Sequence, residues 1–182
     1  FLLGQAFELM VASRSMDALG VLSKAAATIS KGEVMQLAAE GNLATDEAGY
    51  YRTITAKTAA LFAAAAEISP IMAGQETYRD ACHRFGLHLG IAFQLVDDAL
   101  DYQTHSDTLG KAVGDDFAER KVNLPVILGY QCASQDEKLR MSAYFEEGAP
   151  ALSYEAMLTI LDKYSIFTAL KQRAQDEVNK AK

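Results

Sequence analysis

Three aspartates, Asp97, Asp98 and Asp101, lie close together near the middle of the chain. In an α-helix, residues four apart share a face, so Asp97 and Asp101 are expected to point the same way. Asp98 is expected to point about 100° aside, because the helix has 3.6 residues per turn. Gln94 precedes Asp97 by three residues and joins its face. Carboxylates this close repel one another, and burying them unpaired would be costly.

Two arrangements would relieve this repulsion. A divalent cation could bridge the carboxylates, and a donor set made only of oxygen suits Mg²⁺, with Mn²⁺ as an alternative. Otherwise the helix end is solvated and the acids are ordinary surface charge. Large apolar residues around the acids predict a helix that is buried on most sides, which favours the metal site. These apolar residues are Leu87, Leu89, Ile91, Phe93, Leu95, Val96 and Leu100.

Isolated basic residues accompany the acids. Lys111 and Lys121 follow the acidic segment, and Lys57 with Thr58 interrupts an alanine-rich run. A lone lysine in such a helix is usually a surface residue whose stem packs along apolar neighbours. Beside a hydroxyl, it could also bind a phosphate. Magnesium on carboxylates together with isolated lysines is the combination that a diphosphate ligand requires.

Helices must position these residues. Gly41 predicts a helix end, and Asp46 with Glu47 predicts a helix start. A further helix is expected to end near Pro70, because proline is disfavoured inside helices. No strand is required, so we expect one all-α bundle that forms a single domain over residues 1–182. The predicted helices span 1–14, 17–40, 46–67, 75–103, 118–133, 135–147 and 153–180, with a polar loop over 104–117 and a break in the 118–133 helix near Leu124 and Pro125.

The composition narrows the function further. The chain has 182 residues, of which 50% are hydrophobic and 23% charged, and a net charge of −7, so a general nucleic-acid binder is not expected. No transmembrane segment is expected either, because the most apolar run, 59–68, is shorter than the roughly 20 residues that a bilayer span needs. Cys82 and Cys132 have no paired spacing. They are interpreted as reduced core thiols of a cytoplasmic protein.

An ordered series of motifs resembles the trans-isoprenyl diphosphate synthases, the polyprenyl synthetase family. Asn123 stands where the family pattern has threonine, and Ala112 where it has proline. The matching segments are Gly32-Glu33-x-x-Gln36, Lys57-Thr58-Ala59-x-Leu61-Phe62, Gly90-x-x-Phe93-Gln94-x-x-Asp97-Asp98-x-x-Asp101, Lys111-x-x-Gly114-x-Asp116 and Lys121-x-Asn123-Leu124-Pro125.

The resemblance implies an isoprenoid-synthase-type helical bundle, usually a homodimer. Its members join an allylic diphosphate to isopentenyl diphosphate with the help of Mg²⁺. By the same resemblance, Asp97 and Asp101 would hold one Mg²⁺, and Asp98 would support it or share in ligation. Lys57 would act with these acids in catalysis. Phe93 would lie against the apolar part of isopentenyl diphosphate. The allylic diphosphate and its metals would be held by Lys57, Thr58, Gln94, Lys111 and Lys121.

The family's first aspartate-rich motif has no counterpart in this sequence, so we expect a C-terminal portion that lacks the N-terminal helices and is inactive alone. Glu33, Gln36 and the small residues of 56–66 favour a long-chain, octaprenyl- or decaprenyl-type enzyme serving quinone side chains. Close helix packing would also account for those small residues. A non-catalytic subunit, a farnesyl or geranylgeranyl diphosphate synthase, a terpene cyclase and a plain metal-binding bundle remain as alternatives.

Overall fold

The computed structural model describes residues 1–103 and 114–182, and the regular structure in this part of the chain is entirely helical. The prediction of an all-α fold is therefore confirmed. The elements are α1 (Leu2–Ala12), α2 (Met16–Ala39), α3 (Glu47–Ile54), a π-helical turn η1 (Thr55–Ala59), α4 (Ala60–Met72), a 3₁₀ turn η2 (Glu76–Tyr78), α5 (Arg79–Asp101), α6 (Asp115–Ala118), α7 (Leu124–Cys132), α8 (Gln135–Phe145), α9 (Tyr154–Lys163) and α10 (Ile166–Ala181).

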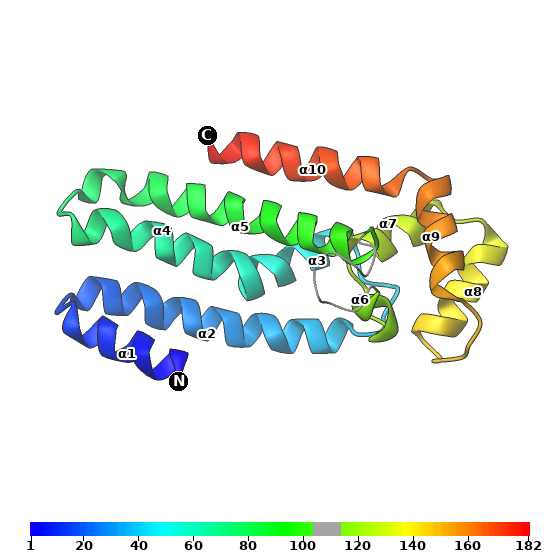
Figure 1. Ribbon diagram of the computed structural model, residues 1–182, viewed down its shortest axis with the longest axis horizontal. Helices are drawn as coiled ribbons and strands as arrows, with labels where there is room; N and C mark the ends of the chain where they lie inside the picture. Colours follow the sequence, from blue (N-terminus) through cyan, green and yellow to red (C-terminus); the bar gives the residue numbers. More distant parts are fainter. Residues whose placement is uncertain (104–113) are drawn as a thin grey trace.

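Long helices run side by side along the length of the molecule (Figure 1). Helix α4 packs on both α2 and α5, and α10 packs on α5. Helices α8 and α9 lie across one end of this layer, while α1 folds back along α2 (Figure 1). The short elements α3, α6 and α7 gather where α5 ends, which places the aspartates of α5 among several chain segments.

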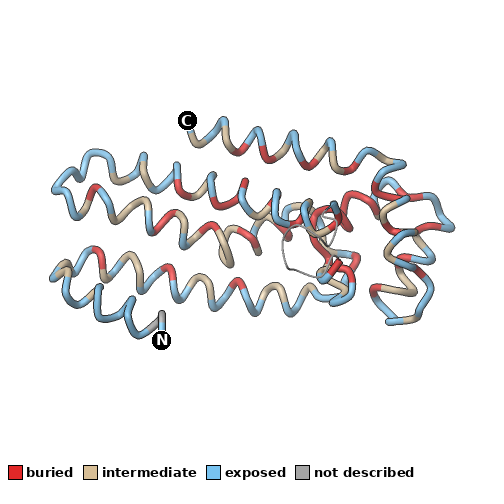
Figure 2. The backbone as a smooth tube through the Cα atoms, in the orientation of Figure 1, coloured by how far each residue is buried: buried red, intermediate tan, exposed pale blue. Residues whose placement is uncertain are grey.

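The buried residues concentrate at that same end of the molecule (Figure 2). Helix α7 is buried from Leu124 to Gly129, and the largest enclosed side chains come from α5, α7, α8, α9 and α10. Burial of this apolar surface stabilises the packing of the helices that surround the acidic end of α5. The largest fully buried side chains are Phe145, Leu95, Leu124, Met141, Met157, Leu161, Leu170, Val126 and Pro125.

Local signals in the sequence account for several helix ends. Asp46 caps α3 by accepting a hydrogen bond of 2.7 Å from the backbone nitrogen of Gly49, as its residue type predicts. Gly41 follows α2 with a left-handed φ of 68°, which glycine adopts without strain. Asn123 caps α7 through Val126, with Pro125 in the first turn.

Other helix boundaries differ from the prediction. The helix expected to end before Pro70 continues to Met72, because a proline in the last turn removes only one hydrogen bond. The helix expected over 153–180 is broken between α9 and α10, where Ser165 adopts a left-handed φ of 54°. No glycine or proline marks that break. Within residues 118–133, by contrast, the break predicted near Leu124 and Pro125 is confirmed, because α6 ends at Ala118 and α7 begins at Leu124.

Helix α5 is not buried on most sides, which corrects a second expectation. Leu89, Phe93 and Val96 are exposed by 39%, 53% and 47%, respectively. Their positions follow a helical spacing, so they form one open stripe while Leu95 on another face is fully enclosed.

Both cysteines are free, as predicted, but Cys132 is exposed and Cys82 only half-buried, so neither is a core thiol. Within residues 1–103 and 114–182, none of the helices combines the length and the apolar character that crossing a bilayer requires.

Candidate functional site

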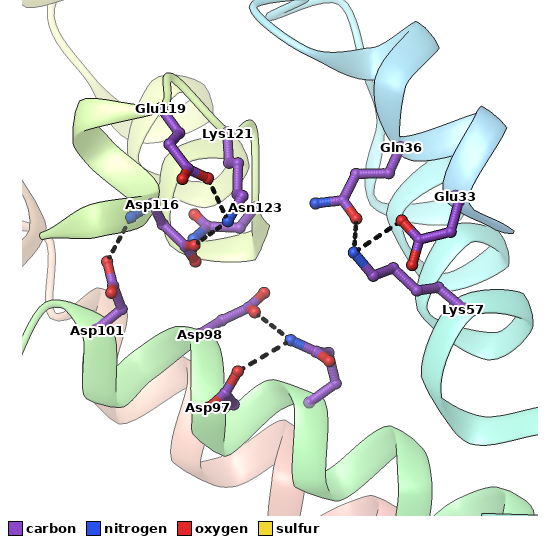
Figure 3. Close-up of polar contacts among 11 residues, drawn as sticks. Glu33, Gln36, Lys57, Asp97, Asp98, Asp101, Asp116, Glu119, Lys121 and Asn123 are labelled. Atoms are coloured by element: carbon purple, nitrogen blue, oxygen red, sulfur yellow. Dashed lines mark hydrogen bonds and ion pairs between the residues drawn. The ribbon is translucent and has the colours of Figure 1, made fainter. Parts of the chain in front are cut away.

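A cavity of about 660 Å³ opens between α2, the π-helical turn and the end of α5. Lys57, Gln36 and Glu33 lie on one side of the cavity, and most of the acidic side chains lie on the other side together with Lys121 and Asn123 (Figure 3). The polar lining residues include Glu33, Gln36, Tyr50, Lys57, Thr58, Gln94, Asp97, Asp98, Asp116, Glu119, Lys121 and Asn123.

The π-helical turn carries Lys57 and Thr58 into the cavity wall. Turns of this kind are rare and are frequent at functional sites. Gly32 of α2 and Gly90 of α5 allow both helices to pack closely against the turn, one on each side. A Cβ atom on Gly32 would lie 2.7 Å from the Cα of Lys57, and one on Gly90 would lie 2.6 Å from the Cα of Ala59. Both helices therefore approach the turn closely only because these positions lack side chains.

Lys57 is held by two residues of α2 (Figure 3). Its Nζ donates a hydrogen bond to Oε1 of Gln36 and lies 3.2 Å from Oε2 of Glu33. An ammonium group has three donors, so two contacts leave capacity for a ligand. Glu33 and Gln36, which belong to one sequence motif, thus both contact the ammonium group of the same lysine.

A hydrogen-bonded chain connects the π turn, α5 and α3. Thr58 Oγ1 donates to Gln94 Oε1 at 2.7 Å. The amide nitrogen of Gln94 donates to Asp98 Oδ1 at 2.7 Å and lies 3.5 Å from Asp97 Oδ2. The hydroxyl group of Tyr50 donates a hydrogen bond to Asp98 Oδ2, also at 2.7 Å. Both oxygens of Asp98 are therefore occupied by protein donors.

Asp97 and Asp98 face different surroundings, as helical geometry predicts. Asp97 is exposed at the cavity, whereas Asp98 is only 4% exposed. Burial raises the pKa of Asp98 to about 7, although hydrogen bonds from Tyr50 and Gln94 pull the pKa lower. Repulsion from Asp116 and Asp97 adds to the increase.

Asp101 is hydrogen-bonded to the first turn of α6. Its Oδ2 accepts a hydrogen bond of 3.1 Å from the backbone nitrogen of Asp116. Asp116 in turn accepts from Lys121 Nζ at 2.8 Å and from Asn123 Nδ2 at 3.0 Å (Figure 3). Burial, followed by the charge of Asp116, raises the pKa of Asp101 to about 6.

Lys121 also pairs with Glu119 at 2.7 Å. Burial opposes its positive charge, but the hydrogen bonds to Asp116 and Glu119 prevail and raise the pKa of Lys121 above its usual value. The acidic wall of the cavity thus carries its own cation.

The structure brings most of the predicted site residues together. Asp101 does not line the cavity itself and reaches it through Asp116. Phe93 lies outside the lining, with its ring 5.3 Å from that of Phe62. Lys111 falls outside the residues that the structure describes. The predicted residues that do line the cavity are Lys57, Thr58, Gln94, Asp97, Asp98 and Lys121.

Sequence reasoning assigned no role to Asp116 or Tyr50. Asp116 stands inside a quoted motif, so its central position could have been inferred from its place beside the acids. Tyr50 meets Asp98 across 48 positions of sequence, and no local pattern signals that contact.

The donor set fits a magnesium ion that is shared with a ligand. Asp97 presents carboxylate oxygens to the cavity, with Asp116 nearby in the lining. Hard oxygen donors of this kind suit Mg²⁺, which commonly takes one or two carboxylates together with substrate phosphates. Among residues 1–103 and 114–182, no three acidic, histidine or cysteine side chains already surround one point, so the protein donors would form part of the coordination.

Known proteins resemble this chain in both sequence and structure. The chain is 35% identical to an octaprenyl diphosphate synthase of Haemophilus influenzae over all of its 182 residues, which cover 55% of that protein. A polyprenyl synthase of Caulobacter crescentus, solved with calcium and isoprenyl diphosphate, has a TM-score of 0.92 and 38% identity over 98% of this chain and 55% of that one. A decaprenyl diphosphate synthase of Rhodobacter capsulatus gives 0.87 and 38% over the same shares.

The chain therefore spans little more than half the length of these relatives, and it has their all-α isoprenoid-synthase fold. The family model described as polyprenyl synthetase matches residues 1–159, so the chain belongs to the polyprenyl synthetase family.

Proposed function

We propose that this chain supplies the allylic diphosphate site of a long-chain trans-polyprenyl diphosphate synthase. In the proposed reaction, the bond between the allylic carbon and the diphosphate oxygen breaks, and the double bond of isopentenyl diphosphate attacks the resulting carbocation. Loss of a proton then gives a longer diphosphate and free diphosphate. The observation that carries the proposal is the cavity itself, which Lys57, Thr58 and Asp97 all line, with Lys57 and Asp97 on opposite sides (Figure 3).

Lys57 and Lys121 would bind the departing diphosphate. Negative charge builds on that group as the bond breaks, so cations already in place stabilise the transition state more than the ground state. Gln36 and Glu33 hold the Lys57 ammonium at the wall, which limits the reorganisation that binding requires. Lys111 belongs to the same proposal by its place in the quoted motif.

Asp97 and Asp101 would hold Mg²⁺, with Asp98 in support through Gln94. Bound there, the ion would offset part of the charge of the diphosphate and so favour ionisation. The exposed position of Asp97 is compatible with ligation, whereas the two donors on Asp98 favour the supporting role.

The product is proposed to be a long-chain polyprenyl diphosphate that serves quinone side chains. The names of the octaprenyl and decaprenyl relatives support the length. Phe93 would lie against isopentenyl diphosphate from its stripe on α5. A cytoplasmic homodimer, in which residues 1–182 form one unit of a larger catalytic domain, completes the proposal.

Calorimetric titration of the chain with inorganic diphosphate, at a series of Mg²⁺ concentrations, tests the site. We expect binding that requires Mg²⁺. The Asp97→Asn variant should lose that requirement along with most of the affinity. Lys57→Met should weaken binding about tenfold or more, since a hydrogen bond to a charged group is worth about 1.5–3 kcal/mol.

The matched control is Asp80→Asn, an exposed carboxylate at the other end of the same helix, which should bind as the parent chain does. Binding that is independent of Mg²⁺, or equal in Asp97→Asn and Asp80→Asn, would contradict the proposed site.

A condensation assay with an allylic primer and labelled isopentenyl diphosphate tests the share of the reaction that this chain performs alone. The sequence holds a single Asp-Asp-x-x-Asp cluster, so we expect binding without turnover. Steady-state product formation would refute that expectation, and a chain that binds no diphosphate would instead support a non-catalytic subunit.

A further inference from the structure

Tyr50 is a buried residue of α3 whose hydroxyl contacts the acidic motif at the wall of the cavity. It is 5% exposed, and its partner Asp98 is 4% exposed. Their 2.7 Å hydrogen bond joins two elements that are 48 positions apart in sequence. A hydrogen bond between buried groups with a carboxylate acceptor is strong, and leaving either group without its partner is costly.

This hydrogen bond fixes the orientation of the Asp98 carboxylate. Oδ2 accepts from Tyr50, so Oδ1 is presented to α5, where Gln94 donates to it at 2.7 Å. An amide has one acceptor oxygen and one donor nitrogen. Because the nitrogen of Gln94 is committed to Asp98, its oxygen must face Thr58, which donates to it at 2.7 Å.

The amide orientation matters at the cavity. With its nitrogen toward α5, Gln94 can also donate to Asp97, whose Oδ2 lies 3.5 Å away. A flipped amide would set its oxygen against Asp97 and Asp98 and its nitrogen against Thr58. Repulsion between oxygens would then displace the exposed carboxylate.

We propose that Tyr50 is a positioning residue, which acts through Asp98 and Gln94 to hold Asp97 and Thr58 in their places at the cavity. The inference rests on the proposed function, because it assigns Tyr50 to the support of the same metal–diphosphate site. In this role Tyr50 would act on the metal site only through its hydrogen bond to Asp98, and it would determine how Asp97 and Thr58 are presented to the cavity.

The test compares Tyr50→Phe with Tyr51→Phe in the 182-residue chain. Tyr51 is the neighbouring, half-buried tyrosine, and its ring meets that of Tyr50 edge-on at 5.7 Å. Each substitution removes only a hydroxyl. Titration with inorganic diphosphate yields the Mg²⁺ concentration at half-saturation, and thermal unfolding of the same samples reports stability.

We expect Tyr50→Phe to raise the Mg²⁺ concentration at half-saturation about tenfold, which is the usual effect of losing an outer partner of a metal ligand. Tyr51→Phe should leave it unchanged. Asp98→Asn should give a similar increase, and the double variant should be no worse than the stronger single one, because both changes break the same chain of contacts. A residue that only stabilised the fold would lower the unfolding temperature without this shift in Mg²⁺ dependence.

A half-saturation point for Tyr50→Phe within twofold of the parent value, or strictly additive effects with Asp98→Asn, would overturn the inference while leaving the proposed function intact. If Tyr50→Phe does not fold, Gln94→Leu tests the same chain from the cavity side, and parent-like Mg²⁺ dependence in that variant would also overturn it. Absence of Mg²⁺-dependent binding in the parent chain would overturn the proposed function, and the inference with it.

Discussion

Glu137 is a buried carboxylate outside the lining of the cavity, and it accepts hydrogen bonds from three residues. It accepts hydrogen bonds from Lys163 Nζ at 2.9 Å, Tyr164 Oη at 2.8 Å and the backbone nitrogen of Ser134 at 2.8 Å. These contacts, with Lys163 as the largest cause, lower the pKa of Glu137 from 4.5 to about 2. Ionised Glu137 therefore joins the start of α8 to the end of α9.

We expect Glu137→Gln to be less stable than the parent chain near neutral pH. A depressed pKa in the folded state gives stability that is present above about pH 4.5 and is lost as pH falls toward 2. The difference in unfolding temperature between parent and variant should therefore shrink over that window. Thermal unfolding from pH 6 to pH 2 measures it, with the exposed Glu155→Gln as control. A difference that is constant with pH would contradict this assignment.

The adjacent pair Asp97 and Asp98 shows how far residue-level prediction could go. Helical geometry predicted that the two carboxylates diverge, and the structure confirms it. The same reasoning could not find Tyr50, because a contact across 48 positions depends on how α3 packs against α5. Spacing therefore identifies the acids, while tertiary packing decides which of them faces the cavity.

At the scale of elements, Gly32 sets the distance between α2 and the π turn. We expect Gly32→Ala to lower the free energy of unfolding by about 1–3 kcal/mol, because the added methyl group would force the backbone of Lys57 away. Gly20→Ala, on the same helix with nothing within 4 Å of its Cβ position, should instead stabilise the chain by about 0.5–1 kcal/mol.

Urea unfolding of both variants measures these changes, and diphosphate titration of Gly32→Ala reports whether Lys57 has moved. Equal stability changes of the same sign in the two variants would show that helix propensity, and not the close approach, governs position 32.

Prediction of the elements succeeded where a residue type has a fixed local meaning, and failed where it has none. Asp46 and Gly41 mark their helix ends through capping and a left-handed turn. Ser165 is exposed and its residue type has no such preference, so the sequence does not signal the left-handed φ that it adopts between α9 and α10. The spacing of apolar residues predicted one helix over 46–67 and did not predict the wide turn at 55–59.

At the scale of the whole molecule, α1 and the start of α2 present large apolar side chains to solvent. Phe7 is 53% exposed, Leu9 and Val11 are each 71% exposed, and Met16 is 77% exposed. Apolar surface gathered on one pair of helices is typical of an interaction face. This surface agrees with the homodimer that the family resemblance implies, which stays a prediction.

We expect sedimentation velocity to show self-association of the chain that strengthens with concentration. Replacing Phe7 and Val11 together by glutamine should weaken it, because these exposed residues share a face of α1 and their buried apolar area is lost. Leu139→Gln, at an exposed leucine on α8, should leave it unchanged. A parent chain that stays monomeric throughout, or an equal effect of the control, would exclude this face as the interface.

The π-helical turn at 55–59 holds one residue more than an α-helical turn. It therefore changes which side chains face the interior along the continuous helical segment formed by α3, η1 and α4. The enclosed positions run Tyr50, Ile54, Ala59 and Ala63, with steps of four, five and four. Uninterrupted α-helical winding would have continued from 54 to 58 and directed the hydroxyl of Thr58 inward. The single wider step sends a methyl group into the protein instead, and so leaves a polar side chain beside Lys57 free to face the cavity.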